Sequence, residues 1–220
     1  MYFQGMPAAH AEMKYQSNDS TYTLSWQADT SPVFNIIYPI HNTYTTKIDP
    51  ASRQPLHYHK VIKQRNVKQN WKINYNWSIL KARSDHGFQW PITPETHNFM
   101  SMLFHLRTRS LQINDSLFYT LDVEDQLWRL CGAVSETQDA KNFYASFKSV
   151  TFQFDSVGTV QERKWDTDLL TNRLSSAETE LVIVLGPEPY NVPYFISFIG
   201  KKGKKVEMKL EDYTNKSLQK

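Results

Sequence analysis

Histidines are the first residues whose spacing could support chemistry. His57 and His59 flank Tyr58, so in an extended chain both imidazoles lie on one face, where they could bind a metal ion. A third ligand would have to come from another segment, such as His41 or His86. Because metal sites usually combine more than one clustered motif, two surface histidines on a strand are the simpler interpretation. We therefore predict no metal site.

The carboxylates and the single cysteine give no catalytic motif. Asp122 with Glu124, and Asp166 with Asp168, fall in polar turns or loops, whereas a glycosidase needs two carboxylates that face each other across a cleft. Cys131 has no partner for a disulfide or a zinc site, and its place in an extended segment indicates a buried, inert side chain. The sequence also lacks a phosphate-binding loop, a nucleophile elbow and a dinucleotide fingerprint. We predict no catalytic residues and no cofactor, which favours a binding protein over an enzyme.

An aromatic row gives the best candidate for a ligand-binding surface. Residues 67–80 alternate strictly, with Trp71, Ile73, Tyr75 and Trp77 on one face and polar side chains on the other. Such large side chains indicate a wide hydrophobic surface beneath the strand. We therefore select Trp71, Tyr75 and Trp77 as candidate ligand-binding residues.

The elements that must position these residues are clearest in residues 95–136. After Pro94, apolar residues recur at intervals of three and four, which predicts a helix. These residues are Phe99, Met102, Leu103 and Leu106. Residues 116–123 then alternate, residues 124–126 form a short polar break, and residues 127–134 are extended again. This pattern predicts a helix followed by an antiparallel hairpin.

The rest of the chain predicts further short strands. Extended segments are expected at 22–26, 34–48, 57–64, 67–80, 150–154 and 181–185, the last of them buried on both faces. A final hairpin should join 194–199 to 206–210, with a solvated tip formed by Lys201, Lys202, Lys204 and Lys205. Residues 165–174 suit a loop or a short helix. About ten short strands favour a mainly β fold, a single curled antiparallel sheet shaped as a half-barrel or open barrel, or else a sandwich. One or two short helices accompany the sheet, and the helix at 99–106 would partly fill the inside of the curled sheet.

Composition and length bound the remaining possibilities. Residues 1–14 are assigned to a tag remnant and a disordered N-terminus, since Met1–Gly5 resembles the remainder of a cleavable tag, while 15–210 form one β-rich domain and 211–220 a polar tail. The 25 basic and 22 acidic residues give a net charge of +3, too low for a nucleic-acid footprint. No apolar run reaches the roughly 18 residues of a transmembrane helix. We therefore expect no nucleic-acid partner and no transmembrane segment.

Three stretches resemble a family of exported bacterial proteins grouped as domain of unknown function 3108. They are KIDP at 47–50 with QPLHY at 54–58, SMLFHLR at 101–107, and NVPY at 191–194, leading through Gly200 into EMKL at 207–210. The resemblance covers roughly residues 22–210. It departs at 181–185, where the family tends to carry Trp and Ser, and at the N-terminus, where a glycine turn is absent.

The resemblance implies a cell-envelope protein with a curved antiparallel sheet, similar to lipoprotein carriers of the LolA and LolB type. It implies no catalytic residues. It also implies a location in the periplasm or at the outer membrane, after removal of a signal peptide. Ser101 and Arg107 are the polar members of the second stretch, and we add them to the candidate ligand-binding residues. Their simpler roles are a helix-terminal hydrogen bond and an ion pair with a carboxylate.

Three functions remain open. The first is a non-enzymatic binding module that holds a lipid or other amphiphile against the aromatic row. The second is an assembly or scaffold protein of the envelope, which docks a partner protein through a sheet edge or the basic hairpin. The third is a carbohydrate-binding or carbohydrate-active protein, which would stack sugar rings on exposed tryptophans. We rank them in this order.

Overall fold

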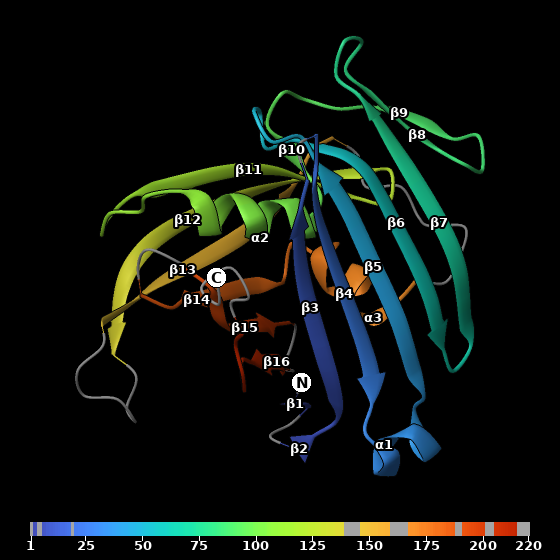
Figure 1. Cartoon of the computed structure of the whole chain (residues 1–220), viewed down its shortest axis with the longest axis vertical. Coiled ribbons are helices and arrows are strands. Elements are labelled where there is room, and N and C mark those ends of the chain that lie inside the picture. The colour runs from blue at the N-terminus through green and yellow to red at the C-terminus, as the bar shows by residue number, and fades with distance from the viewer. Residues whose placement is uncertain are drawn as a thin grey trace.

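The computed structural model describes residues 2–3, 6–18, 20–138, 146–158, 167–187, 191–200 and 205–214. Most of these residues lie in strands, which form two sheets (Figure 1). Neither sheet closes into a barrel. The predicted mainly β, antiparallel class is confirmed, but the strands divide between two sheets where a single curled sheet was the preferred form.

Sheet B contains the N-terminal strands in chain order, and each neighbouring pair is antiparallel. Its strands are β3 (Ala9–Ser17), β4 (Tyr22–Thr30), β5 (Ile40–Ile48), β6 (Pro55–Gln64), β7 (Val67–Asn76), β8 (Lys81–Ser84) and β9 (Gln89–Pro91). The strand β3 covers part of the segment predicted to be a disordered N-terminus. Sheet B therefore contains both the predicted 57–64 strand and the aromatic strand.

Sheet A contains the C-terminal strands and, at one edge, two very short N-terminal strands. Its order is β10 (Thr96–His97), β11 (Ser116–Val123), β12 (Gln126–Gln138), β13 (Ser146–Ser156), β14 (Glu180–Leu185), β15 (Pro193–Ile199), β16 (Lys205–Lys209), β1 (Tyr2–Phe3) and β2 (Met6–Pro7). Neighbours are antiparallel except β10 and β11, which are parallel. The predicted hairpins at 116–134 and 194–210 are confirmed. Of the predicted lysine tip, only Lys205 lies among the described residues.

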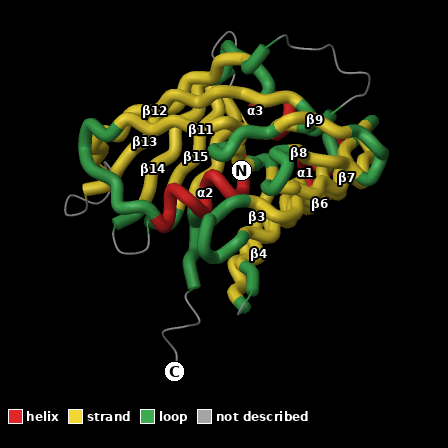
Figure 2. The backbone as a smooth tube through the Cα atoms, turned by 90° about the horizontal axis from the view of Figure 1, so that it is seen from above, coloured by secondary structure: helices red, strands yellow, loops and turns green. Residues whose placement is uncertain are grey.

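The helix α2 (Phe99–Thr108) lies between the two sheets, which explains why they separate (Figure 2). It contacts β5 of sheet B and β11 of sheet A. Apolar residues occur on all sides of this helix, so both sides must be covered. Seven of its residues are buried: Phe99, Met100, Ser101, Met102, Leu103, Phe104 and Leu106. A single sheet can cover only one side. The predicted helix is confirmed, and instead of plugging one curved sheet it forms the centre of a two-sheet core.

The other two helices of the described residues have six residues each. The helix α3 (Leu169–Leu174) lies within the segment predicted as a loop or short helix. The helix α1 (Pro32–Ile37) was not predicted, because residues 34–48 were expected to be extended. Pro32 opens this helix and Pro39 follows it, which matches the helix-starting and helix-ending positions of proline. Among the described helices none is long and apolar enough to cross a membrane.

Two predictions of burial were wrong. Cys131 is exposed, because Leu130 takes the inward position on β12 and Cys131 lies opposite exposed Phe118 on the outer face. In β14 only the face that carries Leu181, Ile183 and Leu185 is buried, and the valines between them are half-buried. In both cases the alternation of a one-sided sheet decides which side chains are covered.

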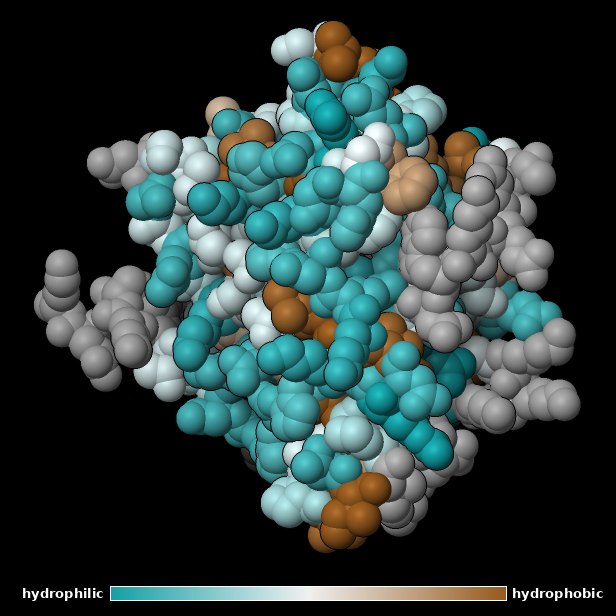
Figure 3. Space-filling view, turned by 90° about the vertical axis from the view of Figure 1, so that its right-hand side faces the viewer, coloured by the Kyte–Doolittle hydropathy of each residue, from teal (hydrophilic) through white to brown (hydrophobic). Residues whose placement is uncertain are grey.

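Most of the buried apolar side chains among the described residues belong to two clusters. The larger one joins both sheets with α2 and reaches α3 through Leu174. The smaller one lies at the β7–β9 end of sheet B and contains Trp71, Ile73, Tyr75, Ala82, Trp90 and Ile92. The side of the molecule beside β7 is mainly hydrophilic, with small and separate apolar areas (Figure 3). The larger of the two buried apolar clusters is the one enclosed between the sheets.

Candidate ligand-binding pocket

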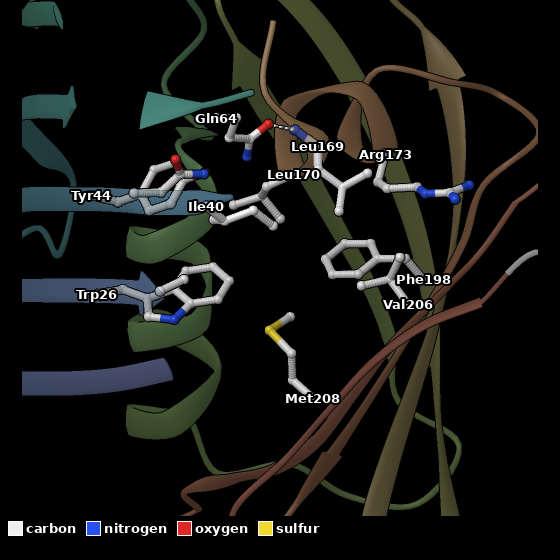
Figure 4. Close-up of a pocket in the computed structure, with 12 residues that line it drawn as sticks. Trp26, Ile40, Tyr44, Gln64, Leu169, Leu170, Arg173, Phe198, Val206 and Met208 are labelled. Atoms are coloured by element: carbon white, nitrogen blue, oxygen red, sulfur yellow. Dashed lines mark hydrogen bonds between the residues drawn. The ribbon is translucent and has the colours of Figure 1, made fainter. Parts of the chain in front are cut away.

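An apolar pocket opens between the two sheets, bounded by β4 and β5 on one side and β15 and β16 on the other (Figure 4). Trp26, Ala28 and Ile40 form the sheet B wall, and Phe198, Val206 and Met208 form the sheet A wall. The cavity between these side chains has a volume of about 30 Å³ and is partly open to solvent. The space suits a slender apolar group.

Polar groups are confined to one end of the pocket. Asn42, Tyr44 and Gln64 line this end from sheet B, and Gln64 Oε1 accepts a 3.3 Å hydrogen bond from the backbone N–H of Leu169 in α3. Arg173, in the last turn of α3, is half-buried, and its side chain extends from the pocket wall away from the apolar centre (Figure 4). The pocket thus combines an apolar body with a cation at its margin, as an amphiphile with a negative head group requires.

A buried ionic network holds α3 against sheet B and so fixes this wall. Lys60, on the inward face of β6, is 0% exposed, and its ammonium pairs with Asp168 Oδ2 at 2.9 Å and with Glu124 Oε1. Asp168 caps α3 by accepting hydrogen bonds from the backbone N–H groups of Leu170 and Thr171. Glu124 accepts a further bond from the hydroxyl of Thr167. The network therefore ties β6, the β11–β12 turn and α3 together.

The protonation of this network follows from its burial and pairing. Burial alone would raise the pKa of Asp168, but the Lys60 ammonium and the hydrogen bonds from Thr171 outweigh it and lower that pKa. Tyr44 donates to Asp168 Oδ1 at 2.8 Å, and burial together with the nearby carboxylate raises the pKa of its phenol well above the ordinary value. Asp168 is thus held as an anion beside a neutral phenol. With no opening to solvent at Lys60, the arrangement is structural.

Ser101 and Arg107 occupy the two ends of α2. Ser101 forms a capping box: Asn98 Oδ1 accepts from the Ser101 backbone N–H, and Ser101 Oγ accepts from the Asn98 backbone N–H. Arg107 is half-buried, donates to the Tyr213 hydroxyl at 3.1 Å and lies over the ring of Tyr15. The helix-terminal role expected for Ser101 is present. The two residues do not meet each other or the pocket.

The aromatic row of β7 also lies away from the pocket. Trp71 and Tyr75 are buried in the smaller cluster and Trp77 is half-buried, with its indole N–H bonded to the Pro55 carbonyl. Tyr75 donates to Asp122 Oδ2 of sheet A at 3.0 Å. Burial raises the pKa of Asp122 to about 7, although the groups of Tyr75 and Trp90 that face it act in the opposite direction. The structure thus places Trp71, Tyr75 and Trp77 together in the smaller packed cluster, and none of them lines the pocket between the sheets.

His105 of α2 meets two other polar side chains, His97 of β10 and Tyr119 of β11. The rings of His97 and His105 stack, and His105 Nδ1 lies 2.9 Å from the Tyr119 hydroxyl. Burial and then His105 lower the pKa of His97 to about 3, and burial with Arg109 and Arg53 lowers that of His105. Both imidazoles are neutral at physiological pH. They act as packed, hydrogen-bonded core groups.

The paired histidines of β6 face the outer side of sheet B. His57 lies 2.5 Å from Asn74 Oδ1 and His59 lies 2.7 Å from Asn70 Oδ1, and these asparagines belong to the neighbouring strand. One ring nitrogen of each histidine, Nδ1 of His57 and Nε2 of His59, is thus engaged in a cross-strand hydrogen bond. No group of three metal-binding side chains occurs in the part of the chain that the structure describes.

Sequence reasoning missed the pocket and the Lys60 network. Lys60 shares its strand face with Ile62, a signal that it points inward, but its partner Asp168 is 108 residues further along the chain. The pocket walls come from strands of different sheets, so no single segment carries their pattern.

Fold and pocket together define a two-sheet β protein with an apolar pocket between its sheets. The chain belongs to the family described as protein of unknown function DUF3108, whose sequence model matches residues 1–126. This confirms the family expected from the sequence. A crystal structure of a DUF1089 family protein from Pseudomonas aeruginosa is similar, with a TM-score of 0.43 and 9% identity over 84% of this chain and 87% of that one. No curated protein matches the chain.

Proposed function

We propose that this protein is a non-enzymatic binding module that takes the apolar part of a lipid or other amphiphile into the pocket between its sheets. The observation that carries the proposal is the pocket itself, which has apolar walls on both sides and Arg173 at its margin. Transfer of a methylene group from water into such a space is favourable by about 0.8 kcal/mol. The cation would pair with a negative head group.

The dimensions of the pocket restrict the ligand. With a cavity volume of about 30 Å³, only a narrow group enters without a change of side-chain conformation. Met208 is an unbranched, adaptable side chain on the sheet A wall, and its rotation is the simplest way to lengthen the space. A single unbranched acyl chain fits this requirement better than a sterol or a sugar.

The placement of the tryptophans favours this function over carbohydrate binding. Trp26, Trp71, Trp90 and Trp128 are buried and Trp77 is half-buried, so the described residues present no exposed tryptophan platform for a sugar ring. Trp165 lies outside the described residues. The envelope scaffold remains the second candidate, supported by the long outer strand β3, whose residues are exposed from His10 to Ser17.

We further propose that the protein acts in the periplasm or at the outer membrane, as the resemblance to exported proteins suggests. Its partners would then be an envelope lipid and, for a scaffold, an envelope protein. Fractionation of cells that express the full-length gene product tests the location. Recovery in the cytoplasmic fraction, with an uncleaved N-terminus, would contradict it.

Ligand binding is tested by displacement of a fluorescent fatty acid with unlabelled fatty acids and lysophospholipids, together with native mass spectrometry of protein purified from its own envelope. We expect Ala28→Leu, which fills the pocket, to weaken binding by about tenfold or more. The matched control is Ala133→Leu on the exposed face of β12. Absence of bound lipid and of displacement by every compound would overturn the proposal, as would equal loss in both variants.

A further inference from the structure

The loop between β4 and β5 exposes apolar side chains at one end of sheet B. It carries α1, in which Val33 is 72% exposed and Ile36 is 88% exposed, and Tyr38 follows at 37%. The lower tip of the molecule, where Figure 1 places α1, is apolar in Figure 3. A helix this short gains little stability by itself, and these side chains contribute no burial to the core. Their exposure indicates a surface that is covered by something else.

Three exposed cations lie beside this tip. The backbone N–H of Arg65 donates to the Pro39 carbonyl at 3.1 Å, which places the β6–β7 turn against the end of the α1 loop. Lys63 and Lys68 face each other across the same turn. Lys63, Arg65 and Lys68 are all exposed, and none forms a salt bridge within the described ranges of the chain.

One neighbouring acidic group offsets only part of this charge. Asp29, at the end of β4, bonds to His41 Nδ1 at 2.9 Å and to the side-chain amide of Gln27 at 2.8 Å. These contacts, the His41 bond first, lower its pKa, so Asp29 is an anion that offsets one of the three positive charges. The tip therefore combines protruding apolar side chains with a cluster of available positive charge.

We infer that this tip, Pro32–Tyr38 with Lys63, Arg65 and Lys68, docks the protein on an anionic lipid surface. Val33 and Ile36 enter the boundary between head groups and acyl chains, and the three cations pair with lipid phosphates. A second copy of this chain is a poorer occupant. A two-fold contact through α1 would bring the three cations close to their own copies, and like charges oppose such a contact.

Docking in this way would also orient the pocket. Ala28 and Ile40, which line the pocket, stand on either side of the α1 loop. The α1 end of the pocket would thus face the lipid. The docking surface goes beyond the proposed ligand binding and does not depend on it, because a protein with an empty pocket would still bind vesicles through its tip.

Cosedimentation of the full chain with vesicles tests the inference. The vesicles contain phosphatidylglycerol and phosphatidylcholine in equal parts, and pure phosphatidylcholine vesicles serve as the comparison. We expect binding to the anionic vesicles that weakens with salt. The double variant Val33→Ser with Ile36→Ser should lower the affinity by about tenfold or more. The triple variant Lys63→Gln, Arg65→Gln and Lys68→Gln should lower it by a similar factor, on anionic vesicles only.

Matched controls separate docking from general effects. Ile79→Ser removes a side chain that is 61% exposed, in the loop that joins β7 to β8. Lys72→Gln, Lys81→Gln and Arg83→Gln remove the same charge from other exposed positions of sheet B. Both controls should bind as the wild type does. Circular dichroism and thermal melting verify that each variant is folded.

Three outcomes would overturn the inference. The first is no binding of the folded wild type to anionic vesicles, and the second is equal binding by the wild type and the Val33/Ile36 variant. The third is a concentration-dependent dimer, in analytical ultracentrifugation, that this variant abolishes while vesicle binding is unaffected, since the tip would then contact a second copy. Fatty-acid displacement is measured separately. If the protein binds vesicles but no fatty acid, only the proposal of ligand binding in the pocket is rejected.

Discussion

Lys60 is the residue on which the buried network depends. It carries the positive charge in a site where Asp168 and Glu124 are also buried, so its removal leaves two carboxylates close together in a dry interior. Replacing one partner of such a group usually costs about 3–5 kcal/mol. Lys63, three residues further along the same strand, points to solvent. The two lysines therefore form a matched pair in one strand.

We expect Lys60→Met to lower the free energy of unfolding by about 3 kcal/mol or more, because the carboxylates lose their cation. Lys63→Met should change it by less than about 0.5 kcal/mol. Urea denaturation followed by circular dichroism measures both. A loss below about 1 kcal/mol for Lys60→Met would mean that the ionic contacts do not hold α3 to sheet B.

Asp122 gives the stability of the protein a dependence on pH. Its pKa is about 7 in the folded protein against 3.8 when unfolded, so the folded state binds the proton more tightly. The stabilisation is complete below about pH 4 and is lost as the pH rises to about 7, by at most about 4 kcal/mol. His97 acts in the opposite sense, because its pKa falls from 6.5 to about 3 and its contribution is lost on acidification.

The effect of Asp122 is isolated by comparing two variants over a range of pH. We expect Asp122→Asn to gain stability relative to the wild type as the pH rises from 4 to 8, because the wild-type carboxylate must ionise without solvent. The control is Asp155→Asn at an exposed position of β13. Urea midpoints at each pH give the difference. Parallel profiles for the wild type and Asp122→Asn would show that this carboxyl does not titrate in the folded protein.

The sequence shows which residue types occur at these sites, but it does not show which side chains surround them in the folded protein. Tyr75 was correctly placed on the apolar face of its strand, while its bond to Asp122 joins strands of different sheets. Asp122 was interpreted as a solvated turn residue because polar residues follow it. Whether a carboxylate is hydrated or enclosed depends on what packs over it, and that is set by segments far away in the chain.

At the scale of the elements, α2 starts where Asn98 and Ser101 form the capping box. Ser101 is fully buried, and its side chain satisfies an N–H group that the first helical turn leaves unpaired. We expect Ser101→Ala to lower the free energy of unfolding by about 1 kcal/mol. Ser110→Ala, at an exposed position after the helix, should have no measurable effect. Urea denaturation provides the comparison.

The same variant distinguishes a structural serine from a ligand-binding one. If Ser101 only caps α2, the affinity for the displaced fluorescent fatty acid stays unchanged once the variant is folded. A loss of affinity larger than about tenfold in a folded Ser101→Ala protein would assign the residue to the ligand site. Phe99 at the start of α2 packs against Trp26 and Phe198 of the pocket wall, but Ser101 itself does not line the pocket and its hydroxyl is engaged in the capping box, which is the reason to expect no loss.

Local patterns predicted the elements wherever one periodicity dominated. The spacing of Phe99, Met102, Leu103 and Leu106 identified α2, and the strict alternation of 116–123 identified β11. The helix α1 escaped because its β-branched and aromatic residues suit a strand equally well, and only its two prolines indicate otherwise. Short apolar segments remain ambiguous because both periodicities fit them.

For the whole molecule, the class of fold followed from the number of strands, while the division into two sheets did not. Hairpins such as β11–β12 form between neighbours in the chain, so their signals are local. The division depends on α2 lying between β5 and β11, which lie far apart in the sequence. The pocket is a consequence of that division. It therefore shares the non-local origin of the two sheets.

The two hydrophobic clusters imply two units of different stability. The smaller cluster, around Trp90, holds the short strands β8 and β9 at one edge of sheet B, whereas β12 and β13 cross the larger core. We expect amide hydrogen exchange in β8 and β9 to proceed through a partial opening of lower free energy, while exchange in β12 and β13 requires global unfolding. Mass spectrometry at low denaturant concentrations measures both.

Variants in each cluster test whether β8 and β9 open alone. Val150 is fully buried in the larger core, so Val150→Ala should lower the exchange free energy of β12 and β13 by about 2 kcal/mol and leave that of β8 and β9 unchanged, because this core stays folded during the partial opening. Trp90→Ala should lower the exchange free energies of β8–β9 and of β12–β13, since the smaller cluster is lost both in the partial opening and in global unfolding. If Val150→Ala lowers the exchange free energy of β8 and β9 by the same amount, the two clusters unfold as a single cooperative unit.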